Sequence, residues 1–190
     1  NLGILGNFHP ELQDADLNPT ETIRYKASDG LEIPAVVTYP RHRPSRKNLP
    51  VIVMPHGGPF GVRDEEEFGF FPWHQAMAEL GYVVIQPNYR GSGGYGKQFV
   101  LEGRKPNGYG QRMQDDLNDA LTWFGQTGLI DPKRACIMGW SYGGYATARG
   151  AQRDPKVWKC AIAGAGIYDF PMMKAFDLGA FGKIGRASCR

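Results

Sequence analysis

The stretch CIMGWSYGGYATARG, residues 136–150, decides the fold expected for this chain. It begins as an apolar run typical of a buried strand and continues with small residues that suit a closely packed helix. Between the two lies Gly139-Trp140-Ser141-Tyr142-Gly143, the only Gly-x-Ser-x-Gly in the sequence. A serine in this pattern occupies a strained turn from strand to helix, a nucleophile elbow, which lifts its hydroxyl clear of the sheet. The alternative is a chance pentapeptide in a chain with 26 glycines.

The residues around Ser141 have the sizes that such a turn requires. Strand and helix approach each other closely there, so the positions two before and two after the serine must be very small, and Gly139 and Gly143 meet that need. The backbone N–H of Tyr142 would then stand at the helix N-terminus and point at negative charge developing on a substrate oxygen. The pattern predicts Ser141 as a nucleophile and the Tyr142 amide as an oxyanion-hole donor.

A second segment, His56-Gly57-Gly58-Pro59, directly follows the apolar run VIVMP. Glycines at the end of a strand let a backbone N–H turn toward a ligand with no side chain in the way. Taken alone, this segment is better explained as a tight turn that ends the strand. Combined with the pattern around Ser141, it favours Gly57 and Gly58 as further oxyanion-hole donors.

The rest of the chain alternates strand and helix patterns. Asp29-Gly30 divides two runs of alternating polarity, which predicts an antiparallel hairpin over residues 22–38. Continuous apolar runs, typical of strands covered on both faces, occur at residues 50–54, 82–86, 135–139 and 160–165. Helical patterns lie between them, at residues 72–81, 113–128 and 142–153. This order predicts an α/β fold with a mostly parallel sheet and helices on both faces.

The first two predicted helices each have a side that we expect to be buried. The side of the first helix consists of Trp73, Ala76, Met77 and Leu80. The side of the second consists of Met113, Leu117, Ala120, Leu121 and Phe124.

Cys136 and Cys160 lie within apolar runs, so we expect both to be buried free thiols that behave as small hydrophobic side chains.

The loop NYRGSGGYGK, residues 88–97, contains glycines that fit parts of two phosphate-binding motifs. A P-loop, however, needs Ser or Thr after its lysine and a helix that starts there. Gln98 follows Lys97, and the next convincing helical pattern comes only after the run EGRKPNGYG, residues 102–110. We therefore expect these glycines to serve backbone geometry after a strand and not to bind phosphate.

Composition fits a single folded domain. The chain has 190 residues, 42% of them hydrophobic. Its formal net charge of +3 does not indicate a nucleic-acid-binding surface. No run approaches the roughly 18 apolar residues of a membrane helix, and Cys, His and acidic residues show no metal-ligand spacing. We expect no metal, cofactor, nucleic-acid or membrane partner. The compartment stays open, cytoplasmic or exported, because a signal segment could have preceded Asn1.

Four segments, in this order, resemble the catalytic domain of the prolyl oligopeptidase family of serine peptidases, in its acylaminoacyl-peptidase and dipeptidyl-peptidase-like branch: LPVIVMPHGGP, GYVVIQPNYRGSGGYG, QDDLNDALTW and GWSYGGYATARGA. The resemblance implies an α/β-hydrolase fold truncated at its C-terminus, with a partial catalytic domain over residues 22–183. It also implies that residues 1–21 join this domain to a missing N-terminal β-propeller. Residues 184–190, in the run KIGRASCR, resemble translated sequencing adaptor and are set aside.

The same resemblance implies hydrolysis of peptide bonds in short peptides, with an acyl-enzyme on Ser141 and a hole formed by the amides of Tyr142, Gly57 and Gly58. In this fold the acid and the histidine of the catalytic triad follow the serine. All four histidines precede Ser141, and Asp169 lies too soon after it, so we expect this chain to lack both partners and to be inactive alone. Two alternatives stay open, a carboxylesterase of the same fold and a non-catalytic hydrolase-like binding domain. Peptide length and oligomeric state are not predicted.

Overall fold

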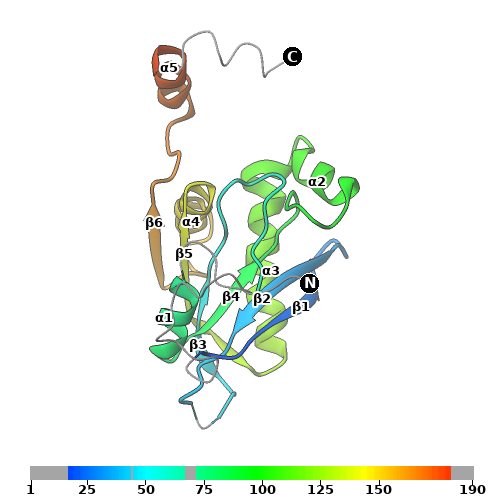
Figure 1. Ribbon diagram of the computed structural model, residues 1–190, viewed down its shortest axis with the longest axis vertical. Coiled ribbons are helices and arrows are strands. Elements are labelled where there is room, and N and C mark those ends of the chain that lie inside the picture. Colours follow the sequence, from blue (N-terminus) through cyan, green and yellow to red (C-terminus); the bar gives the residue numbers. More distant parts are fainter. Residues whose placement is uncertain (1–16, 44, 67–71, 181–190) are drawn as a thin grey trace, which may run out of the picture.

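The computed structural model describes residues 17–43, 45–66 and 72–180, which form a six-stranded sheet with helices beside it (Figure 1). The strands are β1 (Thr20–Lys26), β2 (Glu32–Thr38), β3 (Leu49–Val53), β4 (Val83–Pro87), β5 (Ile130–Trp140) and β6 (Cys160–Gly164). Their order across the sheet is β1-β2-β4-β3-β5-β6. β2 is antiparallel to both neighbours, and the other three pairs are parallel, so the expected mostly parallel α/β sheet is confirmed. Most of the proposed propeller join and all of the adaptor-like tail lie outside the described residues.

The hairpin expected around Asp29-Gly30 is present. β1 and β2 pair over their full lengths, from Thr20 opposite Thr38 to Lys26 opposite Glu32. Gly30 has a φ of +86°, a conformation that favours glycine, and its N–H donates to the carbonyl oxygen of Ala27 at 2.8 Å. The short-range turn signal therefore located this part of the sheet correctly.

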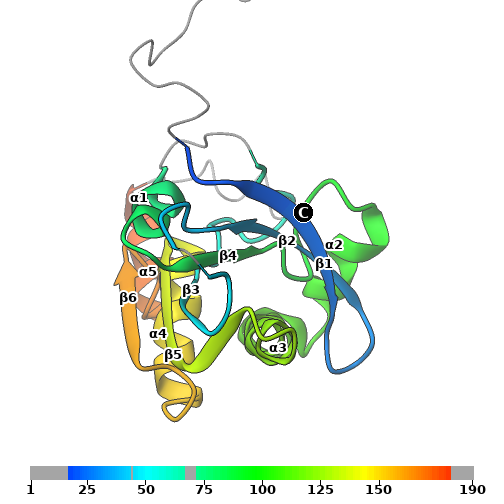
Figure 2. The ribbon, with the colours of Figure 1, turned by 90° about the horizontal axis from the view of Figure 1, so that it is seen from below.

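The helices are α1 (Trp73–Glu79), α2 (Lys97–Arg104), α3 (Met113–Gln126), α4 (Tyr142–Arg153) and α5 (Phe170–Ala180), with a π-type turn at Gly108–Arg112. Viewed from below, α1 lies on one face of the sheet, whereas α3 and α4 lie on the other (Figure 2). α5 stands beyond the carboxyl ends of the parallel strands, above the rest of the molecule in Figure 1. No helix within the described ranges is long and apolar enough to cross a membrane.

The predicted apolar side of α3 is buried against the sheet. Met113, Leu117, Ala120, Leu121 and Phe124 are each at most 3% exposed, and Phe124 packs edge-on against Tyr25 of β1. Burying a leucine or phenylalanine side chain stabilises a fold by about 1.5–3 kcal/mol. The α3 side is thus a main part of the core, and the prediction is confirmed.

The predicted buried side of α1 is wrong. His74 and Ala78 are buried, at 4% and 0% exposure, whereas Leu80 is 67% exposed and Ala76 is also exposed. α1 has only seven residues, and the i, i+4 pair of His74 and Ala78 faces the sheet in place of the expected stripe. In so short a helix, the neighbouring strands decide which side turns inward.

The helix α2 was missed by the sequence analysis. It begins at Lys97, directly after Gly96, whose φ is +90°. The expectation that no helix starts there was therefore wrong, and only the lack of Ser or Thr after Lys97 still argues against a P-loop. The glycines of the preceding loop permit close packing: a Cβ on Gly91 would lie 2.6 Å from the methyl carbon of Met113. This supports their expected role in backbone geometry.

The expectation for the cysteines is also wrong. Cys136 in β5 and Cys160 in β6 lie opposite each other in the parallel register and form a disulfide, with their Cα atoms 4.6 Å apart. Cys136 is half-buried and Cys160 is exposed, because the outer strand β6 has no neighbour on its far side among the described residues. The two sulfur atoms meet only through strand pairing, which is not visible in the local sequence.

Candidate active site

Ser141 lies in the sharp turn between β5 and α4. Its φ of 58° and ψ of −120° place a non-glycine residue in a sparsely populated conformation, as a nucleophile elbow requires. Two backbone hydrogen bonds hold the turn: the N–H of Ser141 donates to the carbonyl oxygen of Gly164, and the N–H of Tyr145 donates to that of Ser141, both at 3.0 Å. Ser141 is exposed, so its hydroxyl is accessible.

Glycines make this turn sterically possible. A Cβ on Gly139 would lie 2.5 Å from the carbonyl group of Gly143, at the point where β5 and α4 approach each other. A Cβ on Gly143 would overlap the carbonyl oxygen of Pro55, and one on Gly144 would overlap that of Gly164. The elbow is thus packed on backbone from the ends of both neighbouring strands, β3 and β6.

The His56-Gly57-Gly58 segment lies against the elbow. A Cβ built on Gly57 would be 3.3 Å from the Cβ of Ser141 and 3.8 Å from its Oγ. Gly58 has a φ of +111°, which favours glycine. The structure therefore brings together the four residues singled out in the sequence: Ser141 and Tyr142 from one turn, Gly57 and Gly58 from the other.

The side chain of His56 holds its own loop. Its Nδ1–H donates to the carbonyl oxygen of Gly57 at 2.7 Å, and its Nε2 lies 2.8 Å from Oγ of Ser92. The ring stacks on Tyr89, whose hydroxyl donates to the carbonyl oxygen of His56 at 2.8 Å. Burial lowers the pKa of His56 to about 4, so the ring is neutral at pH 7. These contacts fix the peptide plane that precedes Gly58.

A buried ion pair holds the glycine-rich loop from the other side. The guanidinium of Arg90 donates to both carboxylate oxygens of Asp116, and the backbone N–H of Arg90 donates to the same carboxylate at 2.9 Å. Arg90 also pairs with Asp29 at the tip of the hairpin, and this lowers the pKa of Asp29. Burial raises the pKa of Asp116 to about 6, so its carboxylate is ionised at pH 7. Asp116 thus acts as a structural tie between α3 and the glycine-rich loop.

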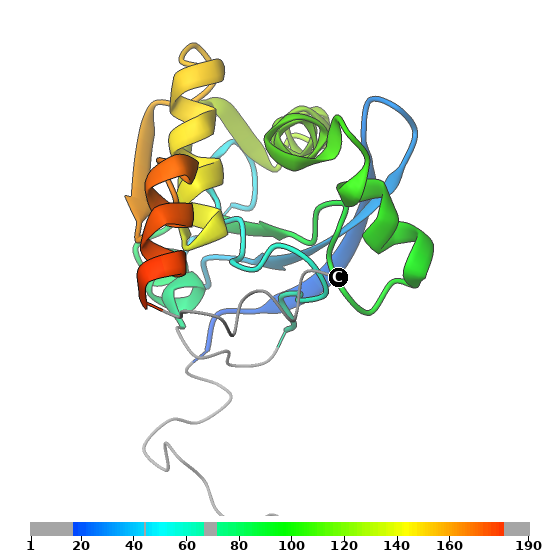
Figure 3. The ribbon, with the colours of Figure 1, turned by 90° about the horizontal axis from the view of Figure 1, so that it is seen from above.

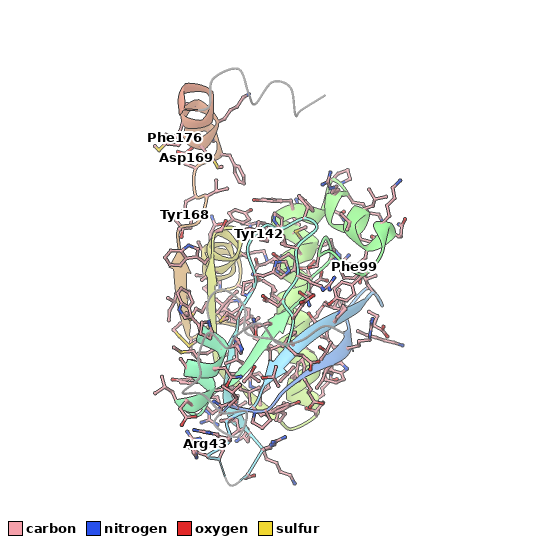
Figure 4. All side chains as sticks on the ribbon, viewed as in Figure 1. Arg43, Phe99, Tyr142, Tyr168, Asp169 and Phe176 are labelled. Carbon is pink, nitrogen blue, oxygen red and sulfur yellow. A yellow bond between two sulfur atoms is a disulfide. The ribbon has the colours of Figure 1, made fainter. Side chains whose placement is uncertain are left out.

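Aromatic side chains line one side of the elbow. The rings of Tyr142 and Tyr109 pack edge-on, with their centroids 4.9 Å apart. The hydroxyl of Tyr142 donates to the sulfur of Met113 at 3.0 Å. Phe170, at the start of α5, lies 5.7 Å from the ring of Tyr145. Burial raises the pKa of Tyr142, so its hydroxyl stays neutral. Figure 4 shows Tyr142 near the carboxyl end of the sheet, with Tyr168 and Asp169 on the segment that leads to α5.

The described histidines and Asp169 serve other contacts. His42 pairs with Glu79, His56 bonds within its own loop, and His74 is buried in α1. Asp169 accepts a hydrogen bond from the N–H of Met172 at 2.8 Å, at the start of α5. Among the described residues no histidine bonds to Ser141, and no group of His, Cys, Asp and Glu is placed to hold a metal ion.

The sequence analysis missed two sets of contacts around this site, the His56–Ser92 contact and the Arg90–Asp116 pair as a support of the loop. His56 and Ser92 are 36 residues apart, and Arg90 and Asp116 are 26 apart. No local pattern relates such positions. Their only signal in the sequence was that all four belong to segments already singled out.

The strand order, the helices on both faces and the serine elbow define an α/β hydrolase. A model of the prolyl oligopeptidase family matches residues 69–185, and the chain belongs to that family. Dipeptidyl aminopeptidase BIII of Pseudoxanthomonas mexicana is 32% identical over 168 residues, which are 85% of this chain and 24% of that protein. The acylamino-acid-releasing enzyme of Mus musculus is 29% identical over 133 residues, 70% of this chain and 18% of that protein.

A solved structure supports the same assignment. The acylaminoacyl peptidase of Pyrococcus horikoshii superposes with a TM-score of 0.72 at 31% identity, covering 88% of this chain and 26% of that one. The chain therefore spans about a quarter of the length of this neighbour and of the bacterial aminopeptidase.

Proposed function

We propose that this chain is part of a serine peptidase in which Ser141 attacks the carbonyl carbon of a peptide bond. The observation that carries the proposal is the position of Ser141, exposed at a φ of 58° and packed against Gly57, with no side chain between them. The Tyr142 amide at the start of α4 and the Gly57 and Gly58 amides would stabilise the oxyanion of the tetrahedral intermediate.

The reaction would proceed through an acyl-enzyme. Oγ of Ser141 forms a bond to the carbonyl carbon, its proton moves to a histidine and then to the leaving amine, and water later releases the acyl group. The acid and histidine of this fold follow the serine, and no described residue after Ser141 bonds to it as a base. We propose that the chain alone is nearly inactive, because oxyanion donors without a base retain only a residual ~10³–10⁴-fold acceleration over water.

The proposed substrates are short peptides. Support comes from the names of the relatives, a dipeptidyl aminopeptidase and acylaminoacyl peptidases, which describe cleavage at the ends of peptides. A carboxylesterase would use the same serine and the same amides. The two activities can be distinguished by measuring kcat/KM for an acylated peptide amide and for a simple ester of the same acyl group.

A fluorophosphonate probe tests both parts of the proposal. We expect slow labelling of this chain at Ser141, none in Ser141→Ala, and fast labelling in a longer version of the chain that also contains an acid and a histidine after Ser141. Fast labelling of the 190-residue chain would contradict its inactivity. A complete chain that is neither labelled nor able to cleave peptides would contradict the peptidase and favour a binding domain.

A further inference from the structure

An open groove lies at the opposite end of the sheet from Ser141. It has a volume of about 550 Å³ and is formed by α3, the start of β5 and the segment between α4 and β6. Lys133, on its rim, precedes Ser141 by 141 − 133 = 8 residues along extended β5, which corresponds to about 26 Å. Figure 2 looks onto this end of the sheet, and Figure 3 looks onto the opposite end, where α5 lies. The groove is therefore separate from the candidate active site.

The floor of the groove is aliphatic and its rim is basic. Leu121, Pro132 and Val157 provide apolar surface, and Lys133, Lys156 and Lys159 provide three exposed ammonium groups. No aromatic or acidic side chain lines the groove within the described part of the chain. The groove can thus cover aliphatic side chains and attract negative charge at the same time.

The acids beside the rim form their ion pairs with arginines. Hydrogen bonds from the Lys133 backbone N–H and from Arg134 lower the pKa of Asp131, and the charge of Lys133 adds to this effect. Asp131, two residues before Lys133, pairs with Arg134, and Asp154, two residues before Lys156, pairs with Arg153. No ion pair joins Lys133, Lys156 or Lys159 to another residue of the described ranges. A ligand that brings carboxylates would therefore form ion pairs that the rim lysines do not make within the described ranges.

We propose that this groove binds an acidic segment of a partner protein that alternates carboxylates with aliphatic side chains. Carboxylates complement the three rim lysines, and leucine or valine side chains complement the floor. A nucleic acid fits less well, because the lining offers no aromatic ring on which a base could stack. A membrane surface fits less well because the apolar floor is concave. The proposal concerns a different end of the molecule from Ser141 and does not depend on the proposed peptidase activity.

The test uses a fluorescein-labelled peptide that alternates Asp or Glu with Leu, titrated with the 190-residue chain and followed by fluorescence anisotropy. We expect saturable binding that weakens as salt rises, because exposed charge pairs are screened. Reversing the rim charges with Lys133→Glu, Lys156→Glu and Lys159→Glu should weaken binding by about tenfold or more. A control with the same net charge change, Lys26→Glu, Lys97→Glu and Lys174→Glu, should bind like the wild type.

A second variant separates the groove from bulk charge. Thr122 is exposed on α3 and lines the groove, so Thr122→Trp fills it without changing charge and should also weaken binding. The proposal is wrong if the wild-type chain does not bind the peptide, if a Lys-for-acid version of the peptide binds equally well, or if the control variant loses as much affinity as the rim variant. It is also wrong if a single-stranded oligonucleotide binds more tightly than the peptide. Ser141→Ala should leave binding unchanged, so this result is independent of the peptidase proposal.

Discussion

Breaking the Cys136–Cys160 disulfide should destabilise the chain by several kcal/mol. The bond closes a ring between residues 24 positions apart, and that ring contains the whole turn around Ser141 and all of α4. The loop-closure entropy of −2.1 − 1.5R ln n, with n equal to this separation, corresponds to about 3.4 kcal/mol at 25 °C. The strands β5 and β6 stay paired from Cys136 to Trp140, so we expect a less stable chain with the same fold.

Urea unfolding, followed by tryptophan fluorescence, measures this effect. With a slope of about 2 kcal/mol/M, the loss corresponds to a midpoint about 1.7 M lower. We expect dithiothreitol to shift the wild-type midpoint down to that of the double variant Cys136→Ala/Cys160→Ala. The reagent should leave the variant itself unchanged, which controls for any other effect of reduction. Equal midpoints for the oxidised and reduced wild type would refute the reasoning.

Three further predictions concern the supports of the site. Gly143→Ala places a Cβ on a backbone carbonyl oxygen and should cost about 3 kcal/mol of unfolding free energy in urea. The pKa of His56 falls from 6.5 to about 4 on folding, so its contribution to stability is complete above pH 6.5 and is lost as pH falls toward 4. Between pH 7 and pH 5 the free energy of unfolding of the wild type should therefore fall by about 2 kcal/mol more than that of His56→Gln. Parallel pH profiles of the two proteins in thermal or urea unfolding would contradict this prediction. Asp116→Asn leaves Arg90 buried beside a neutral amide and should cost about 3–5 kcal/mol, whereas Asp115→Asn, at a half-exposed position, should cost below about 1 kcal/mol in the same assay.

Local patterns predicted the features that depend on local geometry. The hairpin at Asp29-Gly30 and the elbow at Ser141 each need particular residue types within a few positions, so the sequence could locate them. The buried side of α3 was also predictable, because fourteen residues give a clear helical repeat. These elements position the candidate site, and they are why its four residues could be named in advance.

The features that the sequence did not predict depend on contacts between distant segments. α2 contains few buried side chains of its own, and its Gly103 packs on Gly91 and Met113, so tertiary contacts hold a helix that its own sequence does not predict. The disulfide requires the register of β5 against β6. The fixed orientation of His56 requires Ser92, which follows a different strand.

The three glycines of the elbow share a property that limits how the site can change. Each would place its missing side chain on main-chain atoms: Gly139 on Gly143, Gly143 on Pro55 and Gly144 on Gly164. A clash with a side chain can be relieved by trimming that side chain, but main-chain atoms offer no smaller variant. Anyone who transplants this serine into another scaffold must therefore move the ends of β3, β5 and β6 with it as one rigid unit.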